Sequence, residues 1–197
     1  MCLMRAALIA VILVGTLSSA ASASAPGQLR LEDPNGRRVD PFEAAPGTKA
    51  IVFIFTSVEC PISNRYAPDL QRLHRRFAPD GVRFWLVYPH PADSPAIITR
   101  HVRDFGYPMG ALRDPQHELV KLVGVSVTPE TAIYDPTGQM IYRGRIDDRY
   151  VSLGVERPAA MRKDLEDALS ATLAGTAVSE PVTQAVGCFI ADFGRTP

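Results

Sequence analysis

Apolar residues along the chain follow two kinds of pattern. Residues 49–57 (KAIVFIFTS) and 81–89 (GVRFWLVYP) are nearly continuous apolar runs, rich in β-branched and aromatic side chains. Runs of this kind are typical of strands buried on both faces of a sheet. Between the two runs, apolar residues recur every three or four positions, which predicts a helix with one buried face. These residues are Tyr66, Leu70, Leu73 and Phe77.

The rest of the chain continues this alternation of strands and helices. Asn35-Gly36 predicts a tight turn in an N-terminal β-hairpin, because both residues tolerate positive φ. Ser94 before Pro95 is typical of a helix start, and Gly106 marks its expected end. Pro68 is expected near the first turns of the helix before it. The remaining predicted elements are a short strand (111–114), a short helix (115–125), a hairpin (129–146) and an amphipathic helix (158–175).

This order of elements predicts the fold class. A strand–helix–strand start requires a right-handed crossover and therefore a parallel pair of strands. The closing hairpin adds antiparallel strands. We therefore expect one α/β domain over residues 26–175, with a central mixed sheet, helices on both faces and an N-terminal β-hairpin. A C-terminal tail, residues 176–197, follows it and carries Cys188.

Composition is that of a globular protein. The chain has 197 residues, which suits one domain plus a processed leader. It is 46% hydrophobic and 21% charged, and its formal net charge is zero. No basic patch and no long run of like charges stands in the sequence, so we expect no nucleic-acid partner.

Residues 1–25 have the pattern of a secretory signal peptide. Arg5 precedes a short apolar segment, and small residues follow it with cleavage positions after Ala23 or Ala25. The alternative is an uncleaved N-terminal anchor. Cleavage would leave no stable membrane span and would place the protein in the periplasm or outside the cell. Such compartments are oxidising, and the mature chain would keep two cysteines, Cys60 and Cys188.

Cys60 stands where the first buried run gives way to a helix. Backbone N–H groups and the positive end of the dipole at a helix start stabilise a thiolate, which is the nucleophilic form of cysteine. The polar neighbours Glu59, Ser63 and Asn64 indicate a partly open site. We therefore interpret Cys60 as a reactive thiol, and a buried structural cysteine is the alternative.

The segment FTSVECPISN (55–64) resembles the active-site segment of the thioredoxin-like superfamily, where a strand ends in Trp-Cys-x-x-Cys. Cys60 matches the first, attacking cysteine, and Ser63 stands at the second. The second signature of that superfamily, a cis-proline preceded by Thr or Val, is matched by Thr128-Pro129. The resemblance implies a three-layer α/β/α fold in which Pro129 faces Cys60 and, with Thr128, binds an extended substrate segment.

Within this superfamily the chain resembles the redoxin or AhpC/TSA group, particularly its exported members. Peroxiredoxins place a proline and a threonine seven and three residues before the cysteine, where this chain has Phe53 and Ser57. They also place an arginine against the thiolate. None stands beside Pro129, although Arg145 or Arg149 of the following loop would be an alternative source. These departures favour thiol–disulfide oxidoreduction, with peroxide reduction as the second interpretation.

The resemblance also indicates partners and supporting groups. It implies protein thiols and disulfides, or a small peroxide, as substrates, and a separate reductant. It requires no organic cofactor. Ser57 and Ser63 are expected to donate hydrogen bonds to the Cys60 thiolate.

A second thiol is needed to release a mixed disulfide, and the hydroxyl of Ser63 cannot act in this way. Cys188 is the remaining cysteine of the mature chain, and Gly187 is expected to let the backbone turn before it. We hypothesise that the tail folds back and that Cys188 pairs with Cys60. This bridge would stabilise the oxidised domain by roughly 4 kcal/mol. A buried Cys188 and an intermolecular pair are the alternatives.

A metal-binding role is the third interpretation. His90 follows the second apolar run, at the same end of the sheet as Cys60, whereas His74 and His117 are expected on solvated helix surfaces. A Cys/His pair on this fold resembles Sco-type copper chaperones, and thiolate with imidazole suits copper. That family has two cysteines in Cys-x-x-x-Cys spacing and this chain has one, so Cys60 and His90 are weak metal candidates for a carrier or non-catalytic protein.

Residues 143–157 form the most charge-dense stretch of the sequence. We expect the solvated end of a hairpin with surface ion pairs, which are individually weak. The alternative is that this stretch borders Cys60 and supplies a cation to its thiolate or recognises a partner.

Overall fold

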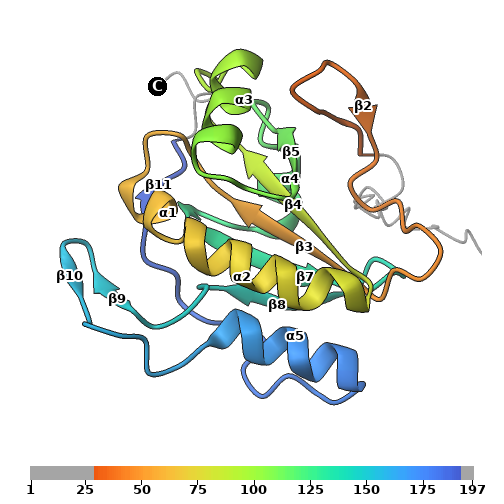
Figure 1. Ribbon diagram of the computed structural model, residues 1–197, viewed down its shortest axis with the longest axis vertical. Coiled ribbons are helices and arrows are strands. Elements are labelled where there is room, and N and C mark those ends of the chain that lie inside the picture. Colours follow the sequence, from red (N-terminus) through yellow and green to blue (C-terminus); the bar gives the residue numbers. More distant parts are fainter. Residues whose placement is uncertain (1–28, 192–197) are drawn as a thin grey trace, which may run out of the picture.

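The computed structural model describes residues 29–191, and its centre is a mixed sheet of seven strands (Figure 1). The spatial order is β2-β1-β5-β4-β3-β7-β8. Strands β3, β4 and β5 run parallel, whereas β7 is antiparallel to β3 and β8 to β7. The strands are β1 (Leu31–Glu32), β2 (Arg38–Val39), β3 (Ala50–Phe55), β4 (Val82–Tyr88), β5 (Gly110–Arg113), β7 (Glu130–Tyr134) and β8 (Met140–Gly144). The predicted mixed sheet and N-terminal hairpin are confirmed.

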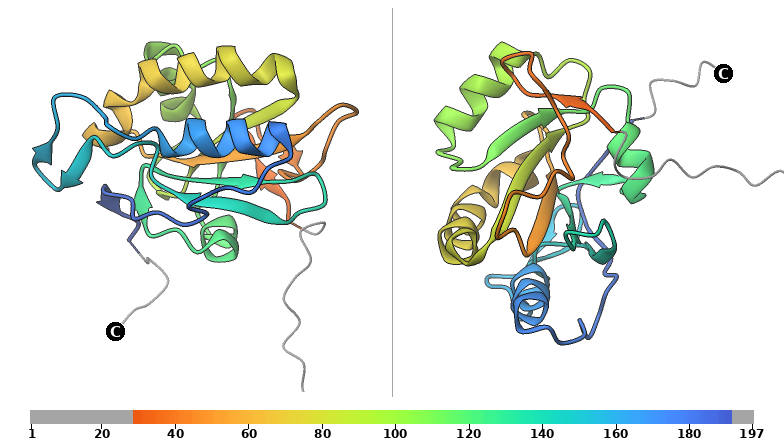
Figure 2. Two further views of the ribbon diagram at one scale, coloured as in Figure 1. Left: turned by 90° about the horizontal axis from the view of Figure 1, so that it is seen from below. Right: turned by 90° about the vertical axis from the view of Figure 1, so that its right-hand side faces the viewer.

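Helices cover both faces of this sheet, which gives the expected three layers (Figure 2). One face packs against α2, α3 and α5, and the other packs against α4 and the N-terminal segment around Phe42. Every residue of β3 is buried, with alternate side chains in the two cores, as its continuous apolar run predicts. The helices are α1 (Pro61–Arg65), α2 (Ala67–Phe77), η2 (Ala78–Asp80), α3 (Pro95–Asp104), α4 (Glu118–Val123) and α5 (Asp164–Ala174).

Local sequence signals set most helix ends. The helix predicted after Cys60 is divided at Tyr66, and Pro68 occupies the first turn of α2, where its missing N–H is not needed. The Ser94 side chain accepts a hydrogen bond from the Ile97 amide at 3.4 Å, so it caps α3 as predicted. Gly106 follows the end of α3 in a left-handed conformation (φ +61°).

The prediction for the last helix was wrong at its start. α5 begins at Asp164 rather than at Pro158, and Met161 is 81% exposed instead of lying on the apolar stripe. The preceding segment is held in an extended path because the Asp148 carboxylate accepts hydrogen bonds from the Met161 and Arg162 amides, at 2.7 and 2.9 Å. The charged stretch before it forms a two-stranded hairpin, β9 (Tyr150–Ser152) and β10 (Val155–Glu156), which projects beyond α1 (Figure 1).

The tail returns along the sheet instead of leaving the domain. Its Pro181 carbonyl accepts from the Arg143 amide at 2.9 Å, and the Thr183 amide donates to the Arg143 carbonyl at 3.0 Å. Gly144 (φ +151°) makes this approach possible, because a side chain there would overlap Thr183. The tail then forms β11 (Cys188–Phe189), which pairs antiparallel with β6 (Val127–Thr128) next to α1.

None of the helices within residues 29–191 is long and apolar enough to cross a bilayer. The predicted signal peptide, residues 1–25, lies outside the described residues.

Candidate active site

Cys60 lies at the junction between β3 and α1. It precedes Pro61 at the start of the helix, and its carbonyl accepts from the Asn64 amide at 3.1 Å. The Asn64 side chain donates to the Val58 carbonyl at 2.9 Å, and its oxygen contacts His101 Nε2 at 2.8 Å. These bonds tie the loop before Cys60 to the helix after it. Cys60 is 2% exposed, so it is more buried than its polar neighbours in the sequence indicated.

The Thr128-Pro129 peptide bond is cis, as the resemblance implied. The Cys60 thiol donates to the Thr128 carbonyl oxygen at 3.0 Å, so the two signature segments meet although 68 residues separate them. The predicted role of Thr128 and Pro129 in holding substrate stays a prediction.

Cys188 is brought to the same place by the pairing of β11 with β6. It stands directly opposite Thr128 in the antiparallel register. Both cysteines line the same small cavity, and each thiol influences the pKa of the other. Both cysteines are free thiols in this structure. The tail therefore folds back toward Cys60, while a disulfide between the two remains a hypothesis.

The two thiols have opposite electrostatic environments. Burial raises the pKa of Cys60, but the neighbouring polar groups of Cys188, Ser63 and Thr128 outweigh burial and lower the pKa below its usual value. Burial and the neighbouring Cys60 sulfur raise the pKa of Cys188 to about 12. The pair therefore favours a thiolate on Cys60 and a protonated thiol on Cys188.

The two serines that were predicted to support the Cys60 thiolate, Ser57 and Ser63, differ in their relation to it. The Ser63 hydroxyl is buried and has no hydrogen-bond partner among the described residues, yet Ser63 lies close enough to Cys60 to lower its pKa. Ser57 lines the same cavity as Cys60, and Ser57 is not among the groups that lower the pKa of Cys60. The expected hydrogen bond from Ser57 to the thiolate stays a prediction.

A small cavity of about 140 Å³ adjoins the two cysteines. Its wall is mostly apolar and includes the tail residues after Cys188, and no arginine within residues 29–191 lines it. The lining residues are Ser57, Glu59, Cys60, Pro89, His90, His117, Thr128, Cys188, Phe189, Ile190 and Ala191.

The histidines depart from the sequence prediction in one case. His90 lies in the wall of this cavity, near Cys60, as expected. His117 was predicted to be solvated, but it is 6% exposed, and its Nε2 donates to the Pro89 carbonyl at 3.0 Å. It directly precedes α4 in a left-handed conformation (φ +58°). Within residues 29–191, no group of three or more metal-ligating side chains is close enough to hold an ion.

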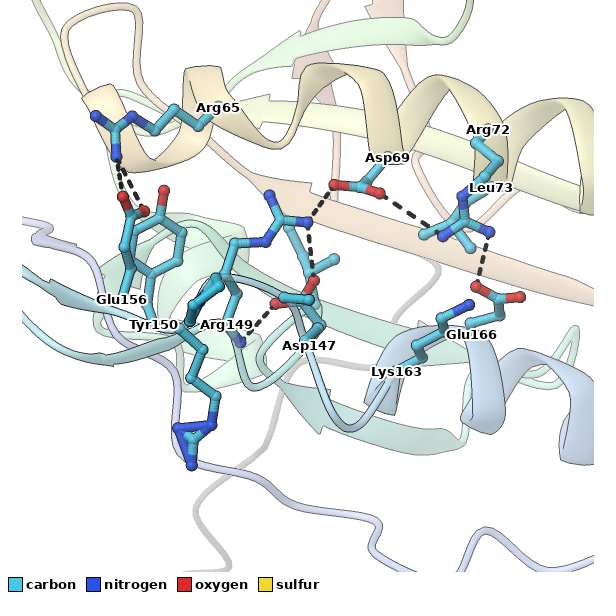
Figure 3. A pocket seen from close by; sticks show the side chains of 15 residues that line it. Arg65, Asp69, Arg72, Leu73, Asp147, Arg149, Tyr150, Glu156, Lys163 and Glu166 are labelled. Carbon is cyan, nitrogen blue, oxygen red and sulfur yellow. Dashed lines mark hydrogen bonds and ion pairs between the residues drawn. The ribbon is translucent and has the colours of Figure 1, made fainter.

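The arginines of residues 143–157 do not line the cavity beside Cys60, and the two candidates named from the sequence pair with carboxylates instead. Arg149 donates to Asp69 at 2.7 Å and also pairs with Asp147, and Arg145 pairs with Asp164 at 2.8 Å. Figure 3 shows the Arg149 cluster in a separate hollow of about 830 Å³ between α2, the β9–β10 hairpin and the start of α5. The predicted ion pairs are confirmed, but Asp147 and Asp148 are buried, so the prediction of a fully solvated hairpin end is wrong. The alternative of an arginine at the thiolate is also wrong, because no arginine within residues 29–191 lines the cavity beside Cys60.

Sequence reasoning missed two residues of this site. His117 carried no local sign of burial, because its helix has six residues and little pattern. Gly187 was expected to provide a turn, but it does not take a positive φ. Instead, it lies against the backbone of Thr128 and Pro129, where no side chain would fit. Only the long-range pairing of β11 with β6 gives this glycine its role.

Comparison with solved structures supports the fold. An uncharacterized conserved protein from Geobacillus kaustophilus is 26% identical, with a TM-score of 0.71, and the match covers 85% of this chain and 89% of that one. A hypothetical protein from Sinorhizobium meliloti is 22% identical, with a TM-score of 0.72 and coverages of 90% and 98%. A secreted Mycobacterium tuberculosis disulfide oxidoreductase homologous to E. coli DsbE is 20% identical, with a TM-score of 0.52 and coverages of 76% and 97%.

A search among curated proteins gave no match to this chain. Comparison with models of protein families identifies the family of this chain. The profile of the AhpC/TSA family matches residues 22–143, a range that includes Cys60 and the cis-Pro129. This chain therefore belongs to the AhpC/TSA family and has the thioredoxin-like fold of the redoxins.

Proposed function

We propose that this protein is an exported thiol–disulfide oxidoreductase in which Cys60 is the nucleophile and Cys188 the resolving thiol. The observation that carries the proposal is the meeting of three features at one point: the Cys60 thiol, the cis Thr128-Pro129 bond and the Cys188 thiol. The secretory pattern of residues 1–25 supports the exported location.

The proposed reaction has two exchange steps. The Cys60 thiolate attacks one sulfur of a substrate disulfide, which forms a mixed disulfide and releases the other substrate sulfur as a thiolate. The Cys188 sulfur then attacks Cys60 in the mixed disulfide, which forms a Cys60–Cys188 bridge and releases the second substrate thiolate. The substrate is reduced by two electrons and the protein is oxidised by two. A separate dithiol reductant returns the protein to its starting state.

The two pKa shifts suit this order of events. Before the first step, burial and the neighbouring Cys60 thiolate raise the pKa of Cys188 and so keep the proton on Cys188. Once Cys60 is in a mixed disulfide, its negative charge is gone. Two of the three causes that raise the pKa of Cys188 are then removed, and only burial remains. Cys188 thus becomes a better nucleophile after Cys60 has reacted.

Reduction of insulin disulfides by a dithiol tests the proposal. Cys60→Ser should abolish turnover, whereas Cys188→Ser should retain one round of attack and accumulate the mixed disulfide. Ser63→Cys supplies a second thiol in Cys-x-x-Cys spacing and should raise turnover. Unchanged turnover in Cys60→Ser would contradict the proposal directly, and so would the absence of a trapped mixed disulfide in Cys188→Ser.

Peroxide reduction is the second candidate, because the cavity beside Cys60 is small enough to favour a small substrate. In this reaction Cys60 attacks a peroxide oxygen and becomes a sulfenic acid, and the alcohol or water leaves. Cys188 would then condense with the sulfenic acid to a disulfide and release water. Consumption of hydrogen peroxide faster than reduction of insulin, at equal reductant, would place this activity first.

A further inference from the structure

The tail binds the sheet in the way that a separate polypeptide strand would bind it. Cys188 and Phe189 are registered opposite Thr128 and Val127, and the Ile190 amide donates to the Ser126 carbonyl at 3.0 Å. These contacts are made by the backbone, so they require little of the side chains. We call residues 187–190 the tail strap. The strap covers the edge of β6 that lies beside Cys60.

The position of the sulfur fixes the register of any strand that occupies this edge. A substrate cysteine must bring its sulfur to Cys60, and in this structure Cys188 does so from the position opposite Thr128. A substrate strand in the same orientation therefore places its cysteine at the same position. Its preceding residue then falls where Gly187 lies.

Gly187 is buried, and there is no room for a larger residue at its position. A Cβ atom there would overlap the Thr128 carbonyl and would lie 3.1 Å from the Pro129 nitrogen. Both are backbone groups, so the obstacle is not a side chain that can rotate away. By contrast, Phe189 on the other side of the cysteine is 80% exposed. The edge of β6 therefore limits the size of the side chain before the cysteine, whereas the side chain after the cysteine can be large.

From these contacts we propose that the tail strap is a resident competitor at the substrate edge of β6, and that the edge accepts extended segments in which glycine precedes the reacting cysteine. This inference rests on the proposed function of Cys60. External substrate and strap use the same backbone groups, so they exclude one another. The strap must leave before a Gly-Cys segment enters, and it must return before Cys188 resolves the mixed disulfide.

Peptides test the specificity. The peptide Ala-Val-Gly-Cys-Phe-Ile-Ala, which copies residues 185–191, is prepared as a mixed disulfide with thionitrobenzoate. Attack by the Cys60 thiolate on the peptide sulfur forms the Cys60–peptide disulfide and releases the coloured thionitrobenzoate. A second peptide has alanine in place of the glycine, and a third has alanine in place of the phenylalanine. We expect the glycine replacement to slow release at least about tenfold and the phenylalanine replacement to leave it within about twofold.

Chain variants test the competition. The background is Cys188→Ser, in which mass mapping assigns alkylation by a bulky maleimide to Cys60. A chain ending at Val186 removes the strap but keeps the pairing of Pro181 and Thr183 with β8. We expect this chain and Gly187→Ala to be alkylated at least about tenfold faster than the background. Val182→Ala changes a 59% exposed tail residue before the strap and should match the background within about twofold. Rates are compared on the high-pH plateau, where Cys60 is ionised in every variant.

The outcomes separate this inference from the proposed function. Equal reaction of the glycine and alanine peptides, or equal alkylation with and without the strap, would overturn the inference while leaving Cys60 a working nucleophile. No release from any peptide, together with no reduction of insulin, would instead overturn the proposed function itself.

Discussion

Oxidation of the Cys60–Cys188 pair should raise the stability of the domain by a large and calculable amount. The bridge would close a loop of about 130 residues, for which the loss of chain entropy in the unfolded state corresponds to about 4 to 5 kcal/mol. Most of this gain should be realised, because Cys188 already lies beside Cys60 in the reduced protein. Formation of the bond therefore requires little rearrangement of the native backbone. For a domain of this size the thermal midpoint should rise by about 8 to 20 °C.

Differential scanning calorimetry of the oxidised and reduced protein measures this shift, after mass mapping has shown the bridge in the oxidised sample. Cys188→Ser is the control, and its midpoint should be the same under both conditions. Equal midpoints for oxidised and reduced wild type, with the bridge present, would refute the reasoning. That result would mean that the bridge strains the native state by as much as it restricts the unfolded chain.

Three further predictions concern buried polar groups. Burial lowers the pKa of His101 below 6.5, so the unfolded chain binds a proton at His101 that the folded protein does not. The free energy of unfolding should therefore keep its full value above pH 6.5 and decrease below it. Urea titrations should show a smaller decrease in His101→Gln. The fully buried Asp114 carboxylate accepts hydrogen bonds from the Glu118 and Val120 amides at the start of α4, at 2.7 and 2.9 Å. Asp114→Ala should lower the free energy of unfolding by about 2 to 3 kcal/mol, and a change under about 0.5 kcal/mol would contradict the stabilising role of these bonds. Arg145→Met removes the closest cation from the Asp164 carboxylate, which is 2% exposed, and should lower the free energy of unfolding by about 3 kcal/mol in urea denaturation. Arg103→Met removes one partner of an exposed ion pair and should change the free energy of unfolding by less than about 1 kcal/mol in the same assay.

The elements that the sequence predicts well are those whose signal is local. The apolar run before Cys60 has the side-chain pattern of a doubly buried strand, and β3 is one. Ser94 and Pro95 cap and begin α3 through contacts within one turn. The last helix was misplaced because Asp148 holds the backbone of Met161 from 13 residues away, a constraint that helical periodicity does not report.

The residues of the candidate site also differ in whether their signal is local in the sequence. Cys60 was identifiable from its place after a buried run and before Pro61, and the cis bond at Pro129 from a family signature. The positions of Cys188 and Gly187 depend on the pairing of two very short strands, β11 and β6, far apart in the sequence. Two-residue strands have no periodicity, so only the folded structure brings these residues to the site.

The course of the tail along β8 has a consequence for solubility. β8 is the outer strand of the sheet, and the stretch around Val182 occupies backbone groups of Arg143 that would otherwise be open to another chain. Exposed strand edges are templates for association between molecules. A protein shortened by proteolysis at Gly175 would lose this cover, and we expect such a fragment to aggregate even where its core is intact.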